Sequence, residues 1–216
     1  MPPTFPSHQG LIAPLWRRWP HLFDMPALCV GAAMPDVIDA FGIFYRAHLG
    51  QAIGHSFVGL FLLCLPGGLL LWYGLHWAAA RVPASRRVGF VRRAWNQGVT
   101  AIRAARPSGP LSTYWRRVMG SLFVGGASHL FFDALTHGHS PWFYPWRNDI
   151  SLYPEWWHIA WMRFPLPLYE HPYPVGPHLL LWILFGLLGA YWLFLPVLRN
   201  THDKQEKEHG AADSKR

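Results

Sequence analysis

The chain has 216 residues, of which 51% are hydrophobic, 16% are aromatic and only 14% are charged. A water-soluble domain usually carries about 25% charged residues, so this composition argues against a soluble protein and favours one embedded in a membrane. The formal net charge of +8 comes mainly from arginines that flank apolar segments, which argues against nucleic-acid binding. We expect an all-α, polytopic membrane helix bundle that forms a single domain over residues 1–199.

Four apolar segments are predicted to cross the bilayer, at residues 26–45, 55–77, 118–136 and 177–198. The second and the fourth contain no Asp, Glu, Lys or Arg and meet the roughly 20-residue length of a bilayer core. The first carries Asp36 and Asp39, and the third carries His129 and Asp133. Because these groups are costly in lipid, we expect both helices to turn them toward the bundle interior.

The connection at residues 78–117 contains nine arginines and no acidic residue. The positive-inside rule therefore places it in the cytoplasm, together with the C-terminus. Apolar residues recur at spacings of three and four from Val88 to Ile102, which predicts an amphipathic helix on anionic lipid headgroups. The arginines expected to contact these headgroups are Arg86, Arg87, Arg92 and Arg93. The alternative is that they only fix the orientation of the chain.

Residues 138–176 are rich in Trp, Tyr and Pro and follow the third predicted span on its outer side. This composition is typical of an aromatic belt at the membrane surface, and the alternative is a lid over a site. Residues 200–216 are polar and contain few apolar side chains, which predicts a disordered cytoplasmic tail.

His129, Asp133 and His137 are spaced four residues apart, which on an α-helix places them along one face. An ionised group at the centre of a lipid-embedded helix costs roughly 2.5 kcal/mol or more. A bound metal, or a proton or ion pathway, would compensate for this cost. Asp36 and His55, in or beside other spans, and His8 near the N-terminus are further candidates.

Imidazole and carboxylate ligands suit a divalent metal, with Zn²⁺ favoured and Mn²⁺ or Fe²⁺ as alternatives. Three or more such ligands with an open coordination position lower the pKa of a bound water, which then serves as the nucleophile. Two metals roughly 3.5–4 Å apart could clamp both oxygens of a phosphoester displacement. In that case Asp39, His137 and His139 are candidates for second ligands or for partners of the ligands.

Four segments of the chain resemble a bacterial integral membrane family of unknown function. They are MPPTFPSHQG at 1–10, GAAMPD at 31–36, His55-Ser56, and GGASHLFFDALTH at 125–137. Members of that family start MPFTFSHP and carry GSMxPD, HS and GAxSHLxxDxxTH. The family is in turn similar to the LexA-regulated membrane-bound metal-dependent hydrolases. The order of His and Asp residues also resembles the zinc-dependent phospholipase C and nuclease fold, an all-α fold with a trinuclear zinc site.

The resemblance covers roughly residues 1–80 and 118–140 and implies a protein of the bacterial cytoplasmic membrane. The metal ligands that it implies are His8, Asp36, His55, His129 and Asp133, with His137 adjacent. This sequence departs from the pattern at Gln9, where the family has Pro, and residues 141–175 have no counterpart in it.

The predicted topology brings most of these ligands together in the extracytoplasmic half of the bundle. His8 can join them only if residues 8–18 form a half-helix, about 16 Å long, that runs from the site to Arg17-Arg18. The chain would then turn back into the first span.

Three functions are compatible with these features. The favoured one is a membrane-embedded metal-dependent hydrolase acting on a phosphoester or other ester of a lipid or envelope molecule. The alternative is a non-enzymatic membrane protein whose buried His and Asp residues form a structural or proton-linked network. The third, a small metal or ion transporter, is disfavoured because no inverted repeat is evident.

Overall fold

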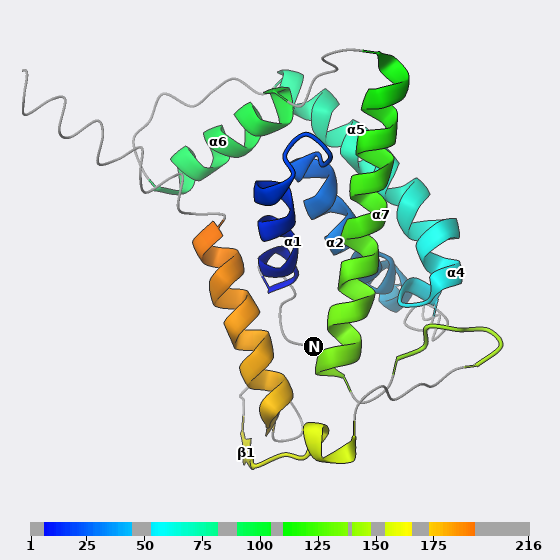
Figure 1. Ribbon diagram of the computed structural model, residues 1–216, viewed down its shortest axis with the longest axis vertical. Coiled ribbons are helices and arrows are strands. Elements are labelled where there is room, and N and C mark those ends of the chain that lie inside the picture. Colours follow the sequence, from blue (N-terminus) through cyan, green and yellow to red (C-terminus); the bar gives the residue numbers. More distant parts are fainter. Residues whose placement is uncertain are drawn as a thin grey trace, which may run out of the picture.

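The computed structural model describes residues 7–44, 53–81, 90–104, 110–137, 140–147, 154–165 and 173–192. These residues are mostly helical (Figure 1). The longer helices are α1 (Ser7–Arg18), α2 (Met25–Phe44), α5 (Leu65–Arg81), α6 (Phe90–Ala104), α7 (Leu111–Thr136) and an unlabelled helix at Pro177–Trp192. The predicted helical architecture is therefore confirmed.

A small antiparallel sheet in the outer aromatic segment departs from the predicted all-α fold. Its strands are β1 (Met162–Phe164) and β2 (Tyr173–Val175), with Arg163 opposite Pro174. A short 3-10 helix, η2 (Glu155–His158), precedes them. Three-residue strands are too short for an alternating pattern to appear in the sequence, which is why the prediction missed them.

Two of the described helices are long and apolar enough to cross a membrane, Phe57–Arg81 and Leu111–Thr136. The first is continuous but contains three parts: α4 (Phe57–Gly59), a π-helical turn η1 (Leu60–Cys64), and α5. The other two predicted spans correspond to α2 and to the shorter apolar helix Pro177–Trp192. A bundle of four spans is thus not established and stays a prediction.

Helix α7 begins seven residues earlier than predicted, so Arg116 and Arg117 belong to it and not to the preceding connection. The reason is the turn between α1 and α2. The Arg117 guanidinium donates hydrogen bonds to the carbonyls of Pro20 and Phe23, at 2.7 and 2.6 Å. The arginine thereby satisfies backbone groups of the turn and fixes it against the first turns of α7.

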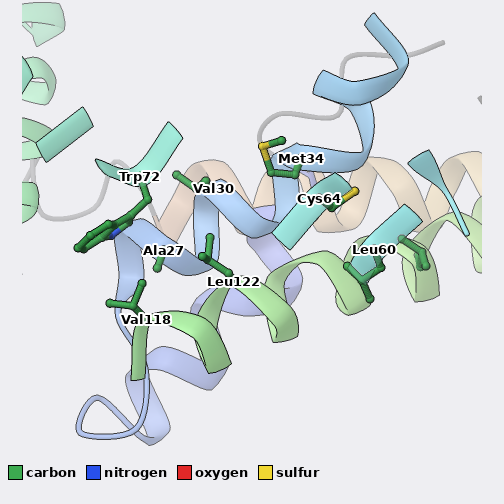
Figure 2. Close-up of a cluster of buried hydrophobic side chains, with 9 residues drawn as sticks. Ala27, Val30, Met34, Leu60, Cys64, Trp72, Val118 and Leu122 are labelled. Carbon is green, nitrogen blue, oxygen red and sulfur yellow. The ribbon is translucent and has the colours of Figure 1, made fainter. Parts of the chain in front are cut away.

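Three helices enclose the main apolar core (Figure 2). Its buried members come from α2, from the Phe57–Arg81 helix and from α7: Ala27, Val30, Met34, Leu60, Cys64, Trp72, Val118, Leu122 and Leu130. The chain runs in opposite directions in α5 and α7, and α1 lies beside α7 with its first residue near the end of α7 (Figure 1). The last residues of α7 therefore meet the first residues of α1 and of α4.

Helices α2 and α7 cross at very close range because both carry glycine at the crossing point. A Cβ atom on Gly31 would lie 2.2 Å from the carbonyl oxygen of Leu122. A Cβ atom on Gly125 would lie 2.3 Å from the carbonyl oxygen of Leu28 and 2.8 Å from the backbone nitrogen of Ala32. Small residues at a helix crossing let the two backbones approach in this way.

We expect Gly125→Ala to destabilise the protein by about 1–3 kcal/mol or more, because its methyl group meets backbone atoms that cannot move independently. Gly120→Ala is the matched control in the same helix, since nothing lies within 4 Å of its added Cβ. Alanine there gains helix propensity of about 1 kcal/mol. Thermal unfolding in detergent measures the stability of both variants. Equal melting temperatures for the two would contradict the close crossing.

Candidate metal centre

Four separate parts of the chain bring polar side chains together where α7 ends. His8 comes from the first turn of α1, and Asp36 from α2. His55 lies in the turn before α4, and His129 and Asp133 lie one turn apart in α7. These are the five residues that the sequence suggested as ligands, and all five side chains converge.

The tightest part of the cluster is a triangle of three ligand atoms. Nε2 of His55 lies 3.1 Å from Nε2 of His129 and 2.8 Å from Oδ2 of Asp133. Nε2 of His129 lies 3.2 Å from the same oxygen. Ligands of a tetrahedral zinc, each about 2.0–2.1 Å from the ion, are about 3.3–3.4 Å apart. The triangle therefore has nearly the size of one face of a zinc coordination tetrahedron.

Asp36 supplies a fourth atom on the same side of the two imidazoles. Its Oδ1 lies 3.6 Å from Nε2 of His129 and 3.8 Å from Nε2 of His55. Both distances are too long for hydrogen bonds, but only a few tenths of an ångström longer than the edge of a zinc tetrahedron. The Asp36 side chain is 23% exposed, so the cluster is open to solvent on this side.

The ring of His129 is held by a backbone carbonyl of α2. Its Nδ1 lies 2.7 Å from the carbonyl oxygen of Ala32, and because a carbonyl only accepts, Nδ1 carries the proton and Nε2 presents its lone pair to the cluster. Pro35 follows within the same helix, and proline removes one hydrogen bond of the helix and disturbs the preceding turn. This disturbed turn is the part of α2 that His129 contacts.

His55 is oriented from two directions. Its Nδ1 lies 3.0 Å from Oδ2 of Asp39, a buried carboxylate on α2. The next residue, Ser56, caps α4: its hydroxyl accepts a hydrogen bond from the Gly59 amide and donates one to the Ile53 carbonyl. The cap fixes the turn that carries His55, and the carboxylate directs its Nε2 toward the cluster. Carboxylate–histidine pairs of this kind hold metal-binding imidazoles in zinc proteins.

His8 reaches the cluster because residues 8–18 lie in α1, the half-helix that was needed for His8 to join the other ligands. Helix α1 starts at the cluster and ends at Arg17-Arg18, and the chain then turns back into α2. The His8 ring stacks on His129, with ring centroids 3.8 Å apart and planes 9° from parallel. Its Nε2 lies 3.8 Å from Oδ1 of Asp133.

His137 lies beside the cluster but is oriented differently. The hydroxyl of Thr136 donates to the Phe132 carbonyl, so its oxygen accepts from Nδ1 of His137, 3.1 Å away. The same Nδ1 lies 3.7 Å from Oδ1 of Asp133. With its proton on Nδ1 and 43% of its side chain exposed, His137 lies at the rim of the cluster.

The structure describes the backbone of only two of the four arginines that were predicted to contact lipid headgroups. Helix α6 confirms that a helix forms in this connection, whereas its position on a lipid surface stays a prediction. It contains Arg92 and Arg93, whose side chains are not described. Arg86, Arg87 and His139 lie outside the described residues.

Two groups that orient the cluster were missed or only partly recognised in the sequence. Asp39 was named as a possible partner, and its spacing of three residues from Asp36 was the available signal. The Ala32 carbonyl was missed, because a backbone group leaves no trace in the residue type.

The outer aromatic segment is attached to the helices at the cluster. The indole of Trp142 donates to the Leu130 carbonyl at 3.2 Å, and that of Trp157 donates to the Leu135 carbonyl at 2.7 Å. The amide of Phe57, the first residue of α4, donates to the carbonyl of Trp142. These bonds tie the segment to both helices that carry the triangle, whether it serves as belt or lid.

The donor set fits a divalent transition metal. Imidazole nitrogen and carboxylate oxygen are ligands of Zn²⁺, Mn²⁺ and Fe²⁺, and both imidazoles of the triangle point Nε2 toward a shared carboxylate oxygen. Buried carboxylates in an apolar bundle require compensating positive charge, which such an ion provides.

We expect Asp39→Asn to weaken zinc binding by about 10–100-fold, because the neutral amide orients His55 less firmly and lowers the basicity of its Nε2. Competition with a chromophoric zinc chelator in detergent measures the dissociation constant. Asp24→Asn is the control, since Asp24 is equally buried but caps the start of α2, away from the cluster. Equal zinc affinity in Asp39→Asn and the unmodified protein would contradict this role.

A family model described as a domain of unknown function, DUF4184, matches residues 1–149. The match covers 149 of 216 residues and includes every residue of the cluster. Comparisons with curated proteins and with solved structures found no match to this chain. The resemblance to a family of unknown function is thus confirmed, whereas none of these findings links the chain to the LexA-regulated hydrolases.

Proposed function

The chain belongs to the DUF4184 family, and we propose that it is a membrane-embedded metal-dependent hydrolase that acts on a phosphoester or other ester of a lipid or envelope molecule. One observation carries this proposal: three ligand atoms from two elements lie within 3.2 Å of one another, and an oxygen atom orients each imidazole. A buried group of this kind matches a catalytic metal site better than a general polar core.

The surface of the Phe57–Arg81 helix supports a position in the membrane. Leu62, Leu70 and Tyr73 expose more than half of their surface, and no charged residue lies between Phe57 and Arg81. Arg81 at the end of α5 and Arg116 near the start of α7 lie at the end of the bundle remote from the cluster. We place that end at the cytoplasmic surface of a bacterial cytoplasmic membrane, with α6 on anionic headgroups and the cluster in the outer half.

His55, His129, Asp133 and Asp36 would hold the metal, for which Zn²⁺ is the first choice and Mn²⁺ or Fe²⁺ the alternatives. When bound, such an ion supplies Lewis acidity and brings the pKa of water to near 7. The residues themselves hold three ligand atoms in place before any ion binds, because Ala32 and Asp39 fix the two rings. Little reorganisation is then needed at the moment of reaction.

Hydrolysis joins the oxygen of water to the phosphorus or carbonyl carbon of the ester and breaks the bond to the leaving alcohol oxygen. One proton of the water is released, and the leaving oxygen takes up one. His137 suits this proton transfer, because it lies at the rim of the cluster with 43% of its side chain exposed and its Nδ1 3.7 Å from the Asp133 carboxylate.

The alternative, a structural or proton-linked network, is supported by a different feature of the same cluster. His55 lies within 3.0 Å of Asp39 and within 2.8 Å of Asp133, so a protonated imidazole would pair with both carboxylates. Such a network needs no metal, which separates it from the hydrolase.

The first test is the metal content of the detergent-purified protein by inductively coupled plasma mass spectrometry. We expect at least one Zn, Mn or Fe per chain, lost when His129→Ala and Asp133→Ala are combined, because both residues contribute to the triangle. His21→Ala is the control, since that exposed histidine lies in the turn between α1 and α2. A metal-free protein that also fails to take up added zinc would favour the structural network.

The second test is hydrolysis in detergent of a chromogenic phosphodiester, bis(p-nitrophenyl) phosphate, and of a carboxylic ester, p-nitrophenyl butyrate. We expect turnover of at least one of them, abolished by a chelator and restored by zinc. Turnover without any ion gradient also separates a hydrolase from a transporter. Activity that persists in the variant combining His129→Ala with Asp133→Ala would refute the assignment of the site.

A further inference from the structure

The two oxygens of Asp133 face different groups. Oδ2 contacts the two imidazoles of the triangle, at 2.8 and 3.2 Å. Oδ1 points the other way, toward Nε2 of His8 at 3.8 Å and Nδ1 of His137 at 3.7 Å. These longer distances are not hydrogen bonds. A carboxylate with one oxygen committed to a first site and the other facing a second imidazole has the arrangement of a bridging ligand.

His8 is buried without the hydrogen bonds that a buried imidazole needs. It is 2% exposed, and its Nδ1 has no hydrogen-bond partner among the residues that the structure describes. Leaving such a group unsatisfied costs about 1–3 kcal/mol. Its position is nevertheless well defined, because the ring stacks on His129 and meets the edge of Phe132 at a centroid distance of 4.9 Å. Packing thus holds a nitrogen-bearing ring toward the carboxylates.

Asp36 also has one oxygen beside the triangle and one that makes no hydrogen bond with the described residues. Its Oδ1 lies on the side of the triangle, 3.6 Å from Nε2 of His129. Its Oδ2 is buried and has no hydrogen-bond partner within the described part of the chain. His8, Asp36 and His129 each offer one ligand atom, and these three atoms lie within 4.8 Å of one another. They form a second group, which shares His129 with the triangle.

We infer a second divalent cation site, formed by His8, Oδ2 of Asp36 and Oδ1 of Asp133, next to the site of the triangle. This inference rests on the proposed function, since both carboxylates are shared with the first site. His137 is not included, because Thr136 engages its Nδ1. Two metals roughly 3.5–4 Å apart are the arrangement that stabilises the attacking and leaving oxygens of phosphoester hydrolysis.

The charge of the cluster also favours two cations. Asp36, Asp39 and Asp133 together carry three negative charges, and the imidazoles that bind a metal are neutral. One divalent ion leaves the cluster with a net negative charge, which repels a phosphodiester anion. Two ions leave one positive charge, which attracts it. A second ion thus directs the site toward anionic phosphoesters in preference to uncharged carboxylic esters.

The test is the number of Zn²⁺ ions bound per chain, measured on detergent-purified, zinc-loaded protein. We expect about two in the unmodified protein, about one in His8→Phe, and none when His129→Ala and Asp133→Ala are combined. Phenylalanine retains the stacking on His129 but has no ligand atom. His137→Gln is the matched control. It removes an imidazole that faces the same oxygen of Asp133 but is not a proposed ligand, so this variant should retain about two ions.

One zinc per chain in both the unmodified protein and His8→Phe would overturn the second site and leave the proposed function standing. No zinc in the unmodified protein would overturn both. A measurement on the unmodified protein avoids dependence on the folding of the variants: Mn²⁺-loaded protein should give the electron paramagnetic resonance spectrum of an exchange-coupled ion pair. A spectrum of isolated Mn²⁺ only, at saturating Mn²⁺, would overturn the second site.

Discussion

The close crossing of α2 and α7 is the constraint on which the rest of the structure depends. Glycine at positions 31 and 125 lets the two backbones approach until a carbonyl of one helix reaches a side chain of the other. That contact, from Nδ1 of His129 to the Ala32 oxygen, sets the tautomer and the direction of the imidazole. Asp36 on α2 and Asp133 on α7 each lie one helical turn further along, so the same crossing brings both carboxylates to that ring.

A polar cluster inside an apolar bundle is stable only if its charges and hydrogen bonds are satisfied. The protein itself satisfies some of these groups: Asp39 pairs with His55, and the Ser56 hydroxyl caps the following turn. The remainder includes Nδ1 of His8 and Oδ2 of Asp36, two buried atoms of cluster residues that have no hydrogen-bond partner among the described residues. Such a pattern is characteristic of a ligand site, in which an ion completes the pairing.

The aromatic segment is held against the end of α7 that carries the cluster. The indole of Trp157 donates to the carbonyl of Leu135, one of the last four carbonyls of α7, which have no partner within the helix. The indole of Trp142 donates to the Leu130 carbonyl, just over one turn earlier. The bond to Leu135 holds this segment close to His137, the exposed residue at the rim of the cluster.

The sequence by itself determined the helical character, the apolar helix Phe57–Arg81 and the candidate residues that form the cluster, because apolar length and the four-residue spacing of His129 and Asp133 are local properties. It also predicted α1 as the half-helix that carries His8. Only the tertiary structure decided how the atoms are oriented. The Ala32 carbonyl and the two faces of Asp133 depend on where backbones cross and which way rings turn. Residue types do not encode those angles, since they arise from packing between segments almost a hundred residues apart.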